Sequence, residues 1–167
     1  MGPSPHDAPP ARITADNPAG TDGFEFVEFA HPEPEKLEEL FTRMGYSKVA
    51  THCSKAISVW RQGDINYVIN AEPGSHAMTF AGAHGPCAAS MAWRVVDAKH
   101  AFVHAVSKGA TPYESDDKAL DVPAIVGIGG SLLYFVDKYG AKGSAYDADF
   151  VWTGARDPKP EGDGFYF

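Results

Sequence analysis

In the stretch FEFVEFAHPEPEKLEELFTRMG, residues 24–45, the spacing of the hydrophobic residues changes once, from the alternation of a strand to the period of a helix. Phe24, Phe26 and Glu28 fall on one face of an alternating run, which is typical of a β-strand. After two prolines, apolar residues recur at the i, i+3, i+4 and i+7 spacing of an amphipathic helix, at Leu37, Leu40, Phe41 and Met44. Gly45 is a natural end for that helix. The stretch therefore predicts a strand followed by a helix.

Along the chain as a whole, the same order of elements occurs twice. After the first helix, three strands are expected at 46–52, 56–61 and 65–71, with a short helix around 76–81. A strand at 88–96 then begins a second series, whose helix has a stripe of apolar side chains and ends at Gly109. That stripe consists of Ala98, Ala101, Phe102, Ala105 and Val106. Strands at 111–113, 124–128 and 131–137 complete the second series.

The repeated order predicts an α+β fold of two paired βαβββ modules. The helices would lie on the convex face of curved mixed sheets, and the concave face would be free to form a cleft. We expect four side chains from the two helical stripes to be largely buried, namely Leu40, Phe41, Phe102 and Val106.

The chain divides into three parts. Residues 1–16, rich in proline, are expected to form a flexible arm. Residues 17–153 would form the folded domain, with modules at about 22–85 and 86–153 and a last strand at 149–153. Residues 154–167 have the composition of a linker and end on Phe165-Tyr166-Phe167, which is consistent with the start of a further domain.

Composition excludes several classes of function. The formal net charge of −8 argues against a nucleic-acid binder and against docking on an anionic membrane. The longest uncharged stretch, residues 122–136, is too short and too rich in glycine to cross a membrane. Cys53 and Cys87 are interpreted as reduced core thiols, and the N-terminus lacks the apolar run of a signal peptide, so we expect a cytoplasmic protein.

Few residues have the spacing of a catalytic or metal site. His100 and His104 are four apart on a helix, but no third ligand is nearby, so a surface pair is favoured. Glu28 is the most interesting carboxylate because its strand faces the expected cleft. Structural interpretations are favoured for the remaining candidates, which are His31, His52, His76, His84, Asp116, Asp117 and the glycine-rich turn at 127–130.

Several short sequence motifs together resemble the N-terminal half of bacterial 4-hydroxyphenylpyruvate dioxygenases. These enzymes belong to the vicinal oxygen chelate (glyoxalase/bleomycin resistance) superfamily. The motifs are Asn17-Pro18, Gly20–Phe29, Arg61–Asn66, Asn70–Pro73, His84–Pro86, Ser131–Asp137 and Asp147–Val151. The resemblance extends from Asn17 almost to the C-terminus. It implies the paired βαβββ fold and an enzyme that converts 4-hydroxyphenylpyruvate and O₂ to homogentisate and CO₂ in tyrosine catabolism.

In that family, Fe(II) is held by two histidines and a carboxylate in the second half, which this sequence does not contain. Matching the two halves by their modules places the equivalent positions near Glu28, Ser90 and Tyr134, of which only Glu28 is a normal iron ligand. The resemblance therefore implies no catalytic, cofactor-binding or metal-binding residue in this chain.

Three hypotheses remain. The first is a non-catalytic half with a structural role, whose partners are a C-terminal catalytic half and other copies of itself. The second is a stand-alone protein of the same superfamily that binds a small molecule. The third is a metal enzyme assembled across a homodimer, which the lack of paired ligands makes least favoured.

Overall fold

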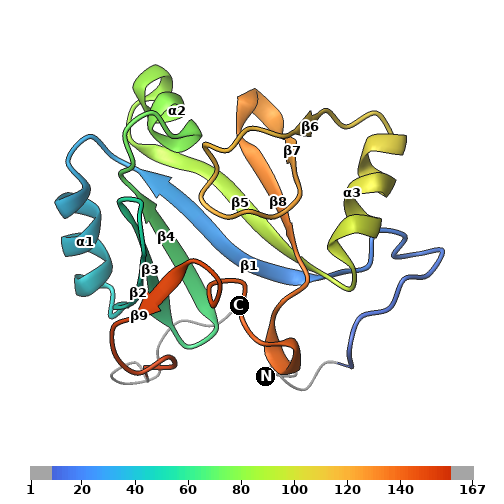
Figure 1. Ribbon diagram of the computed structural model, residues 1–167, viewed down its shortest axis with the longest axis horizontal. Helices are drawn as coiled ribbons and strands as arrows, with labels where there is room; N and C mark the ends of the chain where they lie inside the picture. Colours follow the sequence, from blue (N-terminus) through green and yellow to red (C-terminus); the bar gives the residue numbers. More distant parts are fainter. Residues whose placement is uncertain (1–8, 159–167) are drawn as a thin grey trace.

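The computed structural model describes residues 9–158, which form one mixed sheet with helices outside it (Figure 1). The strands are β1 (Thr21–Ala30), β2 (Ser47–His52), β3 (Ile57–Gln62), β4 (Ile65–Asn70), β5 (Cys87–Val95), β6 (Pro112–Tyr113), β7 (Ala124–Val126), β8 (Leu132–Val136) and β9 (Phe150–Trp152). The α-helices are α1 (Pro34–Arg43), α2 (His76–His84) and α3 (Ala98–Ser107). Short 3₁₀ turns occupy Ile128–Gly130 and Gly140–Lys142.

The strand order β6-β7-β8-β5-β1-β4-β3-β2-β9 confirms the two predicted modules. In each module the first strand lies parallel to the last, β1 beside β4 and β5 beside β8. The modules join through the antiparallel pair β1 and β5 at the centre of the sheet. The last strand, β9, returns to the opposite edge and pairs with β2 of the first module.

Local sequence signals set the ends of the helices. Pro34 begins α1, a position where the missing N–H costs nothing, and Gly45 follows the helix with a φ of 86°. A Cβ at Gly45 would also lie 2.6 Å from the Gln62 side chain, so glycine is required for two reasons. Asp97 caps α3 by accepting a hydrogen bond from the His100 N–H.

Two apolar layers lie outside the sheet, under α1 and α3, while a larger cluster fills its inside. The inner cluster includes Phe26, Val59, Val68, Leu132, Tyr134, Tyr146 and Phe150. Ala119 and Leu120, in the loop that carries Asp116 and Asp117, also turn inward and are buried. The concave face is therefore closed by side chains over most of its length, and the open cleft expected from the pattern is reduced to grooves at its ends.

Helix burial differs from the expectation at one stripe position. Phe41 is buried at 2% exposure, whereas Leu40 is 45% exposed, so its predicted burial is wrong. The ten-residue helix contacts the sheet along a narrow line through Leu37, Phe41 and Met44, which leaves Leu40 at its outer edge. Phe102 and Val106 pack on the second outer layer but are only half-buried.

Smaller differences concern turns and termini. The strand expected at 124–128 ends at Val126, because Gly127 begins a tight turn closed by its N–H bond to the Ser131 carbonyl. Cys53 is exposed just after β2, so it is not the core thiol that we expected. The aromatic ending at 165–167 lies outside the described residues. Within residues 9–158, no helix has the length and apolar character needed to cross a bilayer.

Candidate functional site

The three positions matched to iron ligands come together at the centre of the sheet. Glu28 on β1 is the register partner of Ser90 on β5, and Tyr134 on β8 reaches the same point. All three side chains are at most 3% exposed. The predicted juxtaposition is thus confirmed, although the sequence could not show what the side chains do there.

Neutral donors use both oxygens of the Glu28 carboxyl. Ser90 donates a short hydrogen bond to Oε2, and Tyr134 donates to the same oxygen over 3.4 Å. Asn70, at the end of β4, donates to Oε1 over 2.7 Å. Asn70 was missed by the sequence analysis, but the parallel pairing of β1 with β4 in a βαβββ module could have indicated it.

The Glu28 set does not fit an iron ion. A hydroxyl, a phenol and an amide stand where Fe(II) sites in proteins use histidines and a second charged ligand. Burial raises the pKa of Glu28, while the bonds from Ser90 and Asn70 oppose that rise. No group of three histidine, cysteine or carboxylate side chains is gathered elsewhere among the described residues either.

The candidate histidines make structural contacts and do not gather into a metal site among the described residues. The rings of His100 and His104 stack, with centroids 6.3 Å apart, and His100 Nε2 lies 2.9 Å from the Pro18 carbonyl, which is a structural contact. His76 Nε2 lies 2.8 Å from the Gly130 carbonyl and so fixes the glycine-rich turn. His31 and His52 accept backbone N–H bonds near their own positions, and His84 packs on Phe80.

A polar groove of about 380 Å³ opens at the end of the sheet where β1 begins and β5 ends. Its floor carries a second buried glutamate, Glu25, which is 4% exposed. Arg94 on β5 donates its Nε–H to Glu25 Oε2 over 2.6 Å, and Asn66 on β4 donates to the Glu25 carbonyl over 2.9 Å. Sequence reasoning missed this pair, because it depends on the irregular register of β1 against β5.

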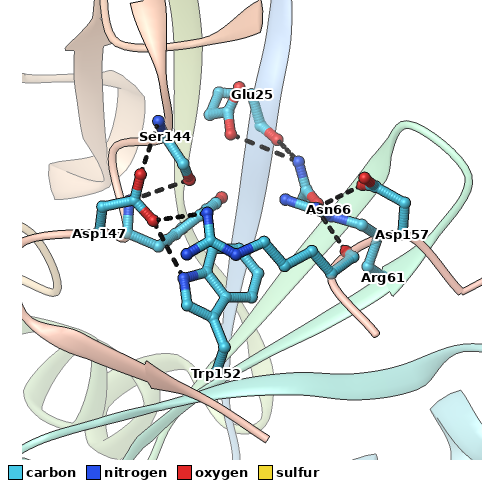
Figure 2. Close-up of polar contacts among 9 residues, drawn as sticks. Glu25, Arg61, Asn66, Ser144, Asp147, Trp152 and Asp157 are labelled. Atoms are coloured by element: carbon cyan, nitrogen blue, oxygen red, sulfur yellow. Dashed lines mark hydrogen bonds and ion pairs between the residues drawn. The ribbon is translucent and has the colours of Figure 1, made fainter. Parts of the chain in front are cut away.

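One wall of the groove is formed by the residues that follow β9. Figure 2 shows Arg61 reaching from β3 to Asn66 and Asp157, with donor–acceptor distances of 2.6 and 2.8 Å. The guanidinium groups of Arg61 and Arg156 both lie over the Trp152 ring, 5.4 and 4.5 Å from its centroid. The first residues of the expected linker are therefore attached to the sheet rather than separate from it.

Comparisons with known proteins give a consistent result. The family described as "Hydroxyphenylpyruvate dioxygenase, HPPD, N-terminal" matches residues 15–151. Hemolysin VllY of Vibrio vulnificus (strain CMCP6) is 51% identical over 143 residues, covering 83% of this chain and 40% of its own length. The 4-hydroxyphenylpyruvate dioxygenase of Pseudomonas sp. (strain P.J. 874) is 47% identical over 151 residues, covering 89% of this chain and 42% of its own length.

A solved structure supports the same family assignment. A xylose isomerase-like TIM barrel/4-hydroxyphenylpyruvate dioxygenase fusion protein superposes with a TM-score of 0.73 at 36% identity, over 87% of this chain and 23% of the fusion protein. The chain spans about two fifths of the length of these first two curated relatives. By the extent of the family match and the level of identity, the chain belongs to the family of hydroxyphenylpyruvate dioxygenase N-terminal domains.

Proposed function

We propose that this chain acts as the non-catalytic N-terminal half of an enzyme that oxidises 4-hydroxyphenylpyruvate with O₂ to homogentisate and CO₂. The named Pseudomonas relative supports the reaction, and the share of that relative which the chain spans supports the assignment to one half. In this proposal Fe(II) is bound by the other half, and the reaction belongs to tyrosine catabolism in the cytoplasm.

The observation that carries the proposal is the closed hydrogen-bonded set around Glu28. A reacting 2-oxo acid and O₂ need open positions on a metal. Here both carboxyl oxygens accept bonds from neutral side chains, and the phenol of Tyr134 also accepts the Ala119 N–H over 3.2 Å. The loop that carries Ala119 thereby covers the set, so this region supports the sheet instead of binding a substrate.

The supporting role would consist of shielding the catalytic half and contributing to a homo-oligomer. The chain has surfaces available for such contacts, since Val103 on α3 and Ile128 in the turn before β8 are 57% and 95% exposed. The exposed cysteine Cys53 is compatible with a reducing cytoplasm.

Complementation in trans tests the division of labour. The chain would be mixed with the C-terminal portion of the Pseudomonas relative, and homogentisate formation would be measured for the mixture and for each piece alone. We expect activity in the mixture that clearly exceeds that of the C-terminal piece. Homogentisate made by this chain alone would refute the assignment of catalysis to the other half. Equal activity of the C-terminal piece with and without the chain would refute the supporting role.

Iron loading tests the Glu28 set directly. After incubation with Fe(II) and desalting, elemental analysis should find far less than one iron per chain. Glu28→Ala should leave that value unchanged. About one iron per chain, lost in Glu28→Ala but not in a Glu25→Ala control, would overturn the conclusion drawn from the neutral donors.

One observation favours a second candidate, a stand-alone small-molecule binding protein of the same superfamily. The groove beside Glu25 has a volume within the range of small-molecule sites. A tight complex between this chain and a small molecule, together with a failed complementation, would favour that function over the first.

A further inference from the structure

The groove beside Glu25 brings four cations together on a chain whose net charge is −8. Its lining includes the cations Arg61, Arg94, Lys138 and Arg156 and the carboxylates Glu25, Asp64 and Asp157. Ion pairs join Arg94 to Glu25, Arg61 to Asp157, and Arg156 to Asp147. Among the described residues Lys138 has no such pair, and a cation of this kind in the groove of a generally acidic protein favours an anionic ligand.

Arg94 has donors that the fold does not use. Its Nε–H is bound to Glu25, but within residues 9–158 its two terminal Nη groups make no hydrogen bond. The side chain is 26% exposed at the groove, and its guanidinium lies over the Tyr139 ring, 5.5 Å from the centroid. The ring and the Glu25 pair hold the guanidinium plane in place. A fixed guanidinium with two free Nη groups matches the two oxygens of a carboxylate or phosphate.

Tyr146 lies close to Glu25 but does not line the groove. Its side chain is fully buried, and burial, followed by the Glu25 carboxylate, raises the pKa of Tyr146, whereas the charges of Arg61 and Arg94 oppose that rise. Contacts to a ligand in the groove therefore depend on the residues of its lining, above all on Arg94 and Lys138.

One further cation can turn toward a ligand. Lys138 is exposed, and no hydrogen bond or ion pair holds its ammonium group among the residues that the structure describes. Arg61, by contrast, is held in place, because it donates to Asn66, to the Arg156 carbonyl and to Asp157.

We propose that this groove is a binding site for the oxyanion group, carboxylate or phosphate, of a small molecule. The terminal Nη groups of Arg94 bind the oxyanion, and Lys138 adds a second charge at the mouth. The site is independent of the proposed catalytic partnership, because every group in it belongs to this chain.

Titration of the isolated chain tests the site. Sodium acetate and sodium phosphate would be added separately and followed by the side-chain N–H signals of Arg94 and Trp152 in NMR spectra, with sodium chloride at equal ionic strength as the blank. We expect saturable shifts with at least one of the two probes. Saturation by acetate alone identifies a carboxylate site, and saturation by phosphate alone a phosphate site. Non-saturating shifts equal to those with chloride would overturn the proposal.

Variants identify the groups. Lys138→Ala should weaken binding about 5-fold, and Lys108→Ala, which removes the same charge at the far end of α3, should change it less than about 2-fold. Arg94→Lys keeps the charge near Glu25 but removes the fork, and should weaken binding about 10-fold. If Lys138→Ala and Lys108→Ala weaken binding equally, only overall charge matters and the site is refuted. Unchanged affinity in a folded Arg94→Lys protein refutes the assigned donor.

Discussion

Glu25 and Glu28 lie three residues apart on β1, and both are almost completely buried, but their surroundings differ. Glu28 is surrounded by a hydroxyl, a phenol and an amide, and no cation from residues 9–158 is in hydrogen-bond contact with it. Glu25 is paired with Arg94 and lies at the floor of a groove. The difference shows that position along the strand decides the role, because Glu28 is at the centre of the sheet and Glu25 near its open end.

Truncating Glu28 should have the largest effect on this comparison. Glu28→Ala leaves Ser90, Asn70 and Tyr134 without their acceptor, and should lower the free energy of unfolding by roughly 4 kcal/mol. Glu25→Ala should cost only about 1–2 kcal/mol, because Arg94 is partly exposed and water can solvate it. Urea denaturation of both variants measures the difference. Equal losses would show that the two environments do not differ energetically.

Packing on the outer layer provides a reference that involves no polar group. Phe41→Ala should destabilise the protein by about 3–4 kcal/mol, and Leu40→Ala by less than about 1 kcal/mol, because only Phe41 fills a buried site. Thermal unfolding and urea titration would check both. A large loss for Leu40→Ala would mean that α1 lies against the sheet along another face.

Removing the cation instead of the acid tests the open end of β1. Arg94→Met leaves Glu25 buried without its partner and should cost roughly 2 kcal/mol, because the pair is only partly shielded from water. The double variant Glu25→Gln/Arg94→Met should recover part of that loss in a double-mutant cycle. Additive losses would show that the pair contributes no coupling.

The pH dependence of stability gives the smallest effect and concerns Glu28. Its pKa in the folded protein is raised above the ordinary value of 4.5, so the folded state holds the proton more tightly than the unfolded state does. Stability should therefore fall as pH rises from about 4.5 through the raised pKa. Glu28→Gln cannot ionise and should lack this contribution. Parallel stability–pH curves for the wild type and Glu28→Gln would contradict it.

The elements were predictable from the sequence because their signals are local. The alternation in residues 24–30 and the helical stripe that includes Phe41 can each be recognised from residues within one or two turns of each other in the sequence. The positions of Glu28, Ser90 and Tyr134 were predictable only through the family resemblance, because the iron-ligand positions of the family's second half were matched onto the modules of this half. The path of the chain between β8 and β9 was not predictable, since periodicity does not indicate that Tyr146 turns back into the concave face.

The groove escaped prediction for a related reason. Arg94 is 69 residues from Glu25, and their contact depends on register shifts between β1 and β5 that no sequence pattern specifies. Leu40 shows that a local pattern can also predict more burial than the structure has. A helical stripe shows which side chains share a face, but the contact line of a short helix is narrower than its apolar stripe.

The return of β9 to the edge of the first module has a mechanical consequence. Three residues, Phe150–Trp152, pair the end of the described chain with β2, and backbone bonds of Cys53 with Asp149 and of Thr153 with Val49 extend this ladder. Arg61 adds side-chain bonds to Arg156 and Asp157. A pulling force applied through residue 158 would therefore load the Arg61 bonds and this short ladder before it reached the long central strands. The strands β2 and β9 would separate first under tension, while the pairing of β1 with β5 stays intact.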